Sequence, residues 1–371
     1  MSNEAKLSQA KIYLLMLLML ITGSCNTIFN KLLNEMESLD RKFTHFFFQT
    51  FMMFIGEMLC LIAYYVIKPE PDSDLPPINV LYLAIPATLD FCGSTIMSFS
   101  LTMMAASVYQ MTRGSIMIFT AIFSVIFLKT KLFKHEIFSL LIIFIGLFIV
   151  GFGALTGTAD NTRTSALGVV TLIIAQLFVA TDFVVEETIV KKYRVHPLQL
   201  TGWEGVYGMI YYSILLSIFY HIRCDVSNPL CYVNQAGEAR LEDFIFAIKQ
   251  LSASMPLCLV SLGYIMSIAV YNFAGLSISK YVSSSCRAVM DNARTVVIWL
   301  FFLLTPYLPN SWREVFIPLQ LVGFVFLVFG TMVYNEIIVL PYLAPEQSEK
   351  ECCDDDEKKK MIDNEKFEQK I

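Results

Sequence analysis

Hydrophobic positions along the chain gather in long runs that are separated by short polar links. The hydrocarbon core of a bilayer is about 30 Å thick, and a helix needs roughly 20 apolar residues to cross it. Each run therefore predicts a membrane-spanning helix. Ten such segments are found, at about 11–33, 46–67, 78–100, 104–128, 136–155, 166–189, 199–220, 254–275, 279–305 and 314–339.

The polar links indicate how these segments are oriented. The link at 68–77, KPEPDSDLPP, is rich in proline and cannot continue a helix, and the longest link spans about 221–252. With the N-terminus in the cytosol, the short inner links are the richer in Lys and Arg, as in KTKLFK (129–134) and KKYR (191–194). Ten spans then place both termini in the cytosol.

An internal repeat relates the two halves of the chain. A shift of 174 residues aligns Val108 with Val282 and Arg113 with Arg287, and a shift of 177 aligns Gly146 with Gly323. Because five helices per repeat is an odd number, the second copy must enter from the opposite side of the membrane. This pattern is typical of secondary transporters, in which the substrate binds near the midplane between the repeats.

The predicted fold is therefore an all-α integral membrane protein with ten transmembrane helices in a five-plus-five inverted repeat. The first repeat is expected at 1–156 and the second at 157–340, with the long loop at about 221–252. Residues 341–371 hold ten acidic and six basic side chains, and we expect them to form a charged, disordered cytosolic tail.

Three charged residues lie in the apolar segment at 279–305. Arg287, Asp291 and Arg294 have the spacing i, i+4, i+7, which places them on one helix face within reach of one another. A charge at the centre of a bilayer costs at least about 2.5–3.5 kcal/mol, so this face must point toward protein or water. The three side chains could form a structural Arg–Asp–Arg clamp, or leave one arginine free to bind an anionic group.

Further polar residues are candidates for the same site. Arg113 is the repeat partner of Arg287, and a guanidinium group suits phosphate or carboxylate. We assign Tyr109 and Asn272 to substrate binding together with Arg113, Arg287, Asp291 and Arg294.

Acidic residues outnumber basic ones in the apolar segments. Four basic groups (Lys31, Arg113, Arg287, Arg294) accompany seven acidic ones (Glu57, Asp90, Asp182, Glu186, Glu187, Glu204, Asp291). Glu57, Asp90, Asp182 and Glu186 are assigned as cavity carboxylates. One of Asp182 and Glu186, which share a helix face, could carry a coupling proton. Glu187 and Lys191 could instead be an ordinary surface pair.

Composition and motifs exclude several other classes. The chain is 56% hydrophobic and 16% charged, and outside the acidic tail it is close to neutral, which does not favour nucleic-acid binding. The sequence lacks a P-loop, an HExxH motif and a GxSxG elbow, so no enzyme, cofactor or metal site is expected. Cys224 and Cys231 share one polar loop and could form a disulfide if that loop faces an oxidising lumen.

Several stretches resemble a known family. They include TGSCNTIFNK (22–31), SVYQMTRGSIMIFT (107–120), YNFAGLSISKYVSSSCRAVMDNARTVVIW (271–299) and VGFVFLVFGTMVYN (322–335). The chain is similar to the drug/metabolite transporter superfamily and, within it, to the sixth-member type of subfamily F of solute carrier family 35. The resemblance implies an endomembrane carrier in the lysosomal or late endosomal membrane, with Golgi or mitochondrial membranes as the alternative.

The expected function is secondary transport of a small polar or anionic metabolite, such as a nucleotide sugar, by alternating access. A degenerate carrier that serves as a membrane scaffold or regulator is the alternative. Expected partners are the lipid bilayer and an unidentified small-molecule substrate. A homodimer is left open, as is an adaptor that binds the tail, where EKKKMI (357–362) resembles an acidic dileucine sorting signal.

Overall fold

The computed structural model describes residues 8–69, 75–101, 103–104, 106–156, 165–224, 231–233, 237–304, 318–334, 338 and 340. The polar link at 157–164 and the tail at 341–371 lie outside these residues, so the expectations for them stay predictions.

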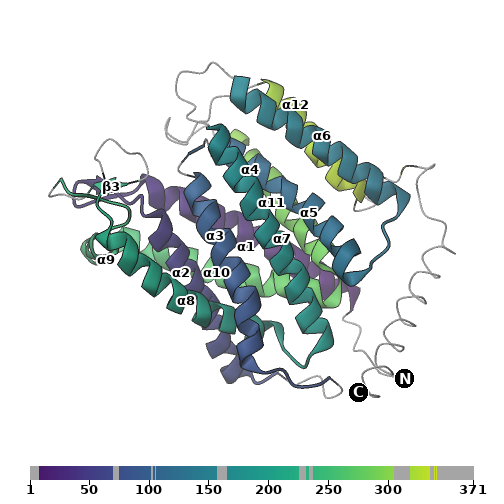
Figure 1. Cartoon of the computed structure of the whole chain (residues 1–371), viewed down its shortest axis with the longest axis horizontal. Helices are drawn as coiled ribbons and strands as arrows, with labels where there is room; N and C mark the ends of the chain where they lie inside the picture. The colour runs from purple at the N-terminus through teal and green to yellow at the C-terminus, as the bar shows by residue number, and fades with distance from the viewer. Residues whose placement is uncertain are drawn as a thin grey trace.

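Helices make up nearly all of the described structure (Figure 1). In chain order the elements are α1 (Gln9–Glu35), β1 (Glu37–Ser38), β2 (Arg41–Lys42), α2 (Phe46–Ile67), the 3-10 helix η1 (Val80–Leu83), α3 (Ala84–Leu101), α4 (Ala106–Thr112), the 3-10 helix η2 (Arg113–Ser115), α5 (Ile116–Phe123), the π-helical turn η3 (Ser124–Leu128), α6 (Lys134–Thr156), α7 (Ala166–Lys192), α8 (Pro197–His221), β3 (Tyr232–Val233), β4 (Ala239–Arg240), α9 (Phe244–Ala253), α10 (Met255–Tyr281), α11 (Ser284–Leu304) and α12 (Pro318–Tyr334).

Each of the ten apolar segments expected from the sequence contains a described helix, and α9 lies outside them. By length and composition, five of the described helical stretches could each cross a membrane: Gln9–Glu35, Phe46–Ile67, Val80–Leu101, Ala166–Lys192 and Met255–Tyr281. Large apolar side chains such as Val66, Leu141 and Phe148 are exposed on the outer surface, as expected for faces that contact lipid. The chain is therefore an all-helical, multi-pass membrane protein, while the number of crossings stays a prediction.

Local sequence signals explain where several helices begin. Ser165 precedes α7, and its side chain accepts a hydrogen bond from the backbone N–H of Leu167. α8 begins with Pro197, whose fixed φ suits the first helical position, and the His196 side chain accepts from the Leu198 N–H. The turn from α7 to α8 is thus only a few residues long, and it brings Glu186 of α7 close to Glu204 of α8.

The helices pack in pairs. α6 packs against α12, α2 against α8, α1 against α10 and α3 against α7. Figure 1 shows α6 and α12 side by side along one edge of the molecule. Glycines permit the closest contacts, because Gly202, Gly205 and Gly208 form a stripe on α8 that lies directly against α2.

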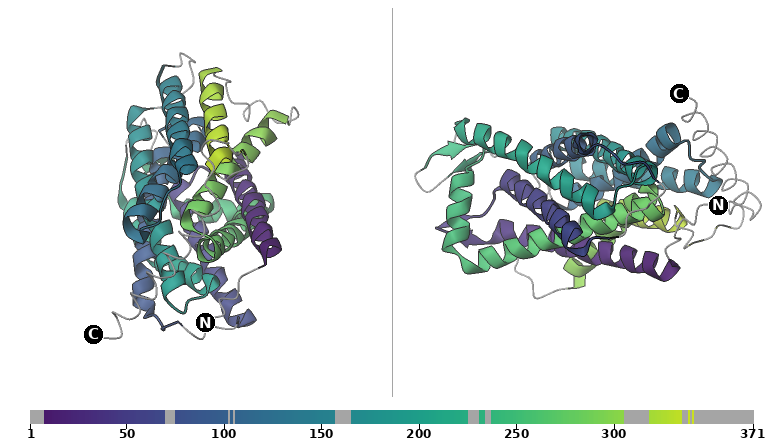
Figure 2. Two further views of the ribbon diagram at one scale, coloured as in Figure 1. Left: turned by 90° about the vertical axis from the view of Figure 1, so that its right-hand side faces the viewer. Right: turned by 90° about the horizontal axis from the view of Figure 1, so that it is seen from below.

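A small unit, which we call the capping unit, covers one end of the bundle and comprises the β1–β2 hairpin, His45, β3, β4 and α9. The imidazole of His45 is fully buried, lies 2.5 Å from a carboxylate oxygen of Glu242 and 3.0 Å from the amide oxygen of Gln250, and contacts the ring of Tyr232. Burial raises the pKa of the Tyr232 phenol to about 12. Seen from below, α9 bridges α8 and α10 at this end (Figure 2).

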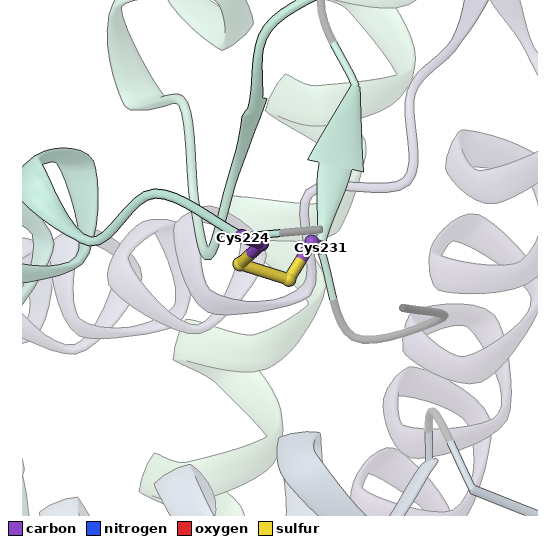
Figure 3. The surroundings of a disulfide bond; sticks show 2 residues. All are labelled: Cys224 and Cys231. Atoms are coloured by element: carbon purple, nitrogen blue, oxygen red, sulfur yellow. A yellow bond between two sulfur atoms is a disulfide. The ribbon is translucent and has the colours of Figure 1, made fainter. Parts of the chain in front are cut away.

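The capping unit corrects one expectation. The long link at about 221–252 was expected to be a loop, but it contains β3, β4 and α9. Asp243 accepts a hydrogen bond from the Phe246 N–H and so begins α9, while Phe246, Ala247 and Gln250 are buried. A disulfide joins Cys224 to Cys231 in this link, as the sequence suggested for an oxidising compartment (Figure 3).

Replacing Gly205 with Ala should separate α2 from α8. The added methyl group would lie 2.7 Å from the carbonyl carbon of Glu57 and 2.7 Å from the carbonyl oxygen of Phe54, which are backbone atoms that cannot turn away. We expect a loss of about 1–3 kcal/mol, typical of overpacking, seen as a lower midpoint of thermal unfolding of the purified protein. Gly263→Ala is the control, because its methyl group meets only the ring of Phe29 at 3.0 Å. Equal midpoints for the two variants would contradict this account.

Removing the disulfide should destabilise the capping unit. The two cysteines are seven positions apart, and opening a ring of that size removes about 2.5 kcal/mol in the chain-entropy treatment. Cys231→Ser should therefore unfold at a lower temperature than the wild type. In the wild type, alkylation without reductant should label two fewer cysteines than alkylation after reduction. Equal labelling with and without reductant would show that the disulfide is absent.

Candidate functional site

The helical segment that carries Arg113 is interrupted at that residue. α4 ends at Thr112, the 3-10 turn η2 covers Arg113–Ser115, and α5 begins at Ile116. Gly114 permits a close approach of α11 at this turn, because an added methyl group would lie 2.9 Å from the side-chain oxygen of Asn292. The interruption thus directs Arg113 toward α11.

A first group of polar side chains, the Asp291 cluster, comprises Tyr109, Arg113, Tyr271, Asp291 and Arg294. The Asp291 carboxylate accepts hydrogen bonds from Arg113 at 3.4 Å and from Tyr271, and lies 2.8 Å from Nη2 of Arg294. The guanidinium groups also lie over aromatic rings, with Arg294 4.9 Å from the Tyr271 ring centre and Arg113 6.0 Å from that of Tyr109.

Exposure distinguishes the two arginines of this cluster. The side chain of Arg113 is 20% exposed, whereas those of Arg294 and Asp291 are each 4% exposed. Two guanidinium groups share one carboxylate, so the cluster carries a net charge of +1. Arg113, the more exposed of the two, is the one placed to bind an additional anionic group.

A second group, the acidic cluster, comprises Glu57, Asp90, Asp182, Glu186 and Glu204 around Arg287. Arg287 donates a hydrogen bond to Glu186, and its guanidinium group lies 3.8 Å from the centre of the Phe183 ring. Asn272 donates to Glu57 at 2.5 Å, and Ser94 donates to Asp90 at 2.8 Å. Asp182 and Glu204 interact electrostatically with the other three carboxyl groups.

The charges of the acidic cluster do not balance. Five carboxyl groups surround one guanidinium group, so full ionisation would leave a net charge of −4. Two like charges 4 Å apart repel by about 4 kcal/mol at an effective dielectric constant of 20. The carboxylates can therefore coexist only if protons or bound cations neutralise part of this charge. Asp182, Glu186 and Glu204 each offer an oxygen within 4.8 Å of the others, a spacing that suits a metal ion.

The structure brings all ten of the predicted site residues into these two clusters. Tyr109, Arg113, Asp291 and Arg294 meet in the first, and Glu57, Asp90, Asp182, Glu186, Arg287 and Asn272 meet in the second. One expected contact differs, because Asp291 pairs with Arg294 and with Arg113 of η2, whereas Arg287 turns to Glu186 of α7. The clamp therefore joins α11 to another segment instead of closing on α11 alone.

Two residues of these clusters were not assigned from the sequence. Glu204 was noted as a charge in an apolar segment but given no role, although that same signal singled out the other carboxylates. Tyr271 carries no comparable signal, because tyrosine is common near membrane helices.

Glu187 does pair with Lys191 at 2.6 Å, but its side chain is only 3% exposed. Its second oxygen accepts from the Ser284 N–H at the start of α11.

Comparisons with known proteins agree with this architecture. Residues 10–152 match the EamA-like transporter family. Solute carrier family 35 member F6 of Rattus norvegicus is 38% identical over 334 residues, which cover 86% of this chain and 87% of the relative. The Homo sapiens protein of the same name is 36% identical over 334 residues, with the same coverage.

Two further similarities extend the comparison. An uncharacterized protein of Schizosaccharomyces pombe is 32% identical over 336 residues, which cover 88% of this chain and 98% of the relative. A protein of known crystal structure superposes with a TM-score of 0.56 over 89% of this chain and 98% of the other, at 11% sequence identity. That last similarity concerns the fold alone. Taken with the buried charged clusters and the helical architecture, the relatives show that the chain belongs to the EamA-like transporters and, among them, to solute carrier family 35, a family of membrane transporters and not of enzymes.

Proposed function

We propose that the protein is a secondary transporter that carries a small polar or anionic metabolite across an endomembrane by alternating access. The Asp291 cluster carries this proposal, because its net charge of +1 and the partly exposed Arg113 suit a phosphate or carboxylate group. A nucleotide sugar offers such phosphates, together with a base that could stack on the cluster's aromatic rings. Asn272 and Asp90 of the acidic cluster are partly exposed and could contact the sugar.

The pairing of helices supports an inverted repeat of five and five. In such a repeat α1 is equivalent to α7, α2 to α8 and α3 to α10. The packing of α1 against α10 then has its equivalent in that of α7 against α3, and both contacts are present. The packing of α2 on α10 has its equivalent in that of α8 on α3, and both of these occur as well. The pairs α2–α8 and α6–α12 would map onto themselves.

The glycines of α6 and α12 also support an inverted repeat. A methyl group added at Gly146 would lie 2.8 Å from the carbonyl oxygen of Gly323, and one added at Gly323 would lie 2.7 Å from that of Gly146. The repeat equates these two residues with each other. Reciprocal contact between equivalent residues is what a two-fold axis through that point requires.

The arrangement suggests which parts would move. A short 3-10 segment inside a helical segment often marks a hinge, and η2 carries the partly exposed arginine of the cluster. A ligand bound to Arg113 would compete for the contact with Asp291, and so would couple binding to the packing of η2 against α11. The capping unit, whose disulfide requires an oxidising compartment, is proposed to face the lumen of a lysosome or late endosome.

Replacing Arg113 with Gln should strongly impair transport. The variant removes the exposed cationic donor while retaining a side chain of similar length, so we expect uptake of the substrate to fall about ten- to a hundredfold, the loss typical of one hydrogen bond to a charged group. The measurement is uptake of a panel of radiolabelled nucleotide sugars into proteoliposomes, driven by preloaded substrate or by a pH gradient. Arg287→Gln should also strongly reduce uptake, because it leaves Glu186 without its cation.

Arg194→Gln is the matched control, since Arg194 is an exposed arginine outside both clusters. It should transport at the wild-type rate, and all variants should reach the membrane in equal amounts. If wild-type protein shows neither uptake nor ligand-dependent thermal stabilisation across the panel, a scaffold role replaces the transporter proposal. Unchanged uptake by Arg113→Gln would instead remove the Asp291 cluster from the substrate site.

The proposed orientation gives a separate prediction. An epitope tag at the C-terminus should bind antibody after selective permeabilisation of the plasma membrane, whereas a tag inserted after Gly237 should require permeabilisation of internal membranes. Gly237 is exposed in the capping unit and adopts a φ of 78°, typical of a turn. Reversed accessibility of the two tags would contradict cytosolic termini and a lumenal capping unit.

A further inference from the structure

The acidic cluster contains three carboxyl groups that converge on one point. Asp182 and Glu186 lie one turn apart on α7, and Glu204 faces them from α8, with one oxygen of each within 4.8 Å of the others. The three side chains are nearly fully buried, at 4%, 3% and 4% exposure. Such a group gathers three ligands from two helices in a place that bulk water does not reach.

Two oxygens of this group lack hydrogen-bond donors, although Glu186 accepts from Arg287 and shares a hydrogen bond with Glu204. Among the residues that the structure describes, Asp182 Oδ1 and Glu204 Oε1 are buried and accept no hydrogen bond. Glu57 on α2 presents a third such oxygen, Oε2, although its side chain is only 1% exposed. A buried carboxylate oxygen without a donor can be compensated by a cation or a proton, because burial without compensation is costly.

Packing places Glu57 beside the same point. A methyl group at Gly205 would lie 2.7 Å from the carbonyl carbon of Glu57, so the backbones of α2 and α8 meet next to Glu204. Glu57 interacts electrostatically with both Asp182 and Glu204. The unpaired oxygen of a third helix therefore borders the three convergent carboxyl groups. Thr201, whose buried hydroxyl lacks a partner among the described residues, lies one turn before Glu204 on the same face of α8.

The resident cation does not neutralise these groups. Arg287 donates to Glu186 and faces Asp182 and Glu204 at longer range, leaving four of the five carboxyl groups of the cluster without a paired positive charge. The available ligands are carboxylate oxygens, with a hydroxyl nearby, and such ligands favour hard cations such as Mg²⁺, Mn²⁺ and Ca²⁺ over softer metals.

We propose that Asp182, Glu186 and Glu204 bind one hard divalent cation, with Glu57 as an adjacent ligand. The ion would join α7 to α8 and would border α2, so one charge would connect both proposed halves of the molecule. Its binding does not depend on the proposed function. The consequence that such an ion could drive or gate transport does rest on that function.

Mn²⁺ binding to the purified full-length protein in detergent tests the site. Free Mn²⁺ gives an electron paramagnetic resonance signal that disappears on binding, so a titration yields the stoichiometry and the Kd. We expect one ion per chain, displaced by Mg²⁺ or Ca²⁺. Asp182→Asn and Glu204→Gln should each weaken binding by at least about tenfold, because the loss of even an outer partner of a metal ligand costs about ten- to a hundredfold. Glu187→Gln, on the same helix but paired with Lys191, should bind Mn²⁺ like the wild type.

Thermal unfolding in the presence of a chelator is a second measurement, and it compares the stability of the variants with that of the wild type. Without the cation, Asp182→Asn and Glu204→Gln should be at least as stable as the wild type, because each removes repulsion among the carboxylates. Divalent ions should then raise the unfolding midpoint of the wild type more than that of either variant.

Four results would overturn the site. They are no Mn²⁺ bound at one per chain, equal affinity in the ligand variants and in Glu187→Gln, stabilisation by acid with no response to divalent ions, and a response to Na⁺ alone. Stabilisation by acid alone would show that protons neutralise the carboxyl groups. Mn²⁺ binding without uptake of any substrate would leave the cation site standing while rejecting the proposed transport.

Discussion

An ionised side chain among apolar helices needs an opposite charge close by, and this requirement fixes the position of α11. Each charge on that helix is matched: Arg287 by Glu186 of α7, Asp291 by Arg113 of η2, and Arg294 by Asp291 itself. A rotation of α11 about its axis would break contacts with two other segments at once. The remaining packing of the central helices is built around this fixed face.

The buried charged residues form two clusters of opposite net charge. Tyr271 and Asn272 are neighbours on α10, yet Tyr271 donates to Asp291 in the positively charged cluster, whereas Asn272 donates to Glu57 in the acidic one. Arg287 and Asp291 are likewise one turn apart on α11 and belong to different clusters. Opposite net charges thus lie within about one turn of each other along the same two helices, and each favours a different kind of ligand.

Much of this architecture follows from the sequence, because long apolar runs determine helix positions almost alone. The costly charges within those runs also identified most of the site. What the sequence could not supply were the partners, since Glu186 and Arg113 reach α11 only through the tertiary arrangement of distant helices. Spacing on one helix suggested that Asp291 would contact Arg287, but a carboxylate on α7 competes for that arginine. The capping unit was missed for another reason: α9 is apolar but only ten residues long, too short for a membrane span, and it follows the polar part of the link.

The capping unit makes the two ends of the molecule unequal. A covalent bond between Cys224 and Cys231 secures the link after α8, and Glu242 of the same link contacts both His45 and the backbone N–H of Phe48 at the start of α2. Hydrogen bonds of Glu242 and a link closed by a disulfide thus connect the first turns of α2 to the end of α8, in addition to apolar packing. If the two halves tilt against each other as proposed, the capping unit would restrain this end of the bundle, and the opposite end would separate more widely for the same energy.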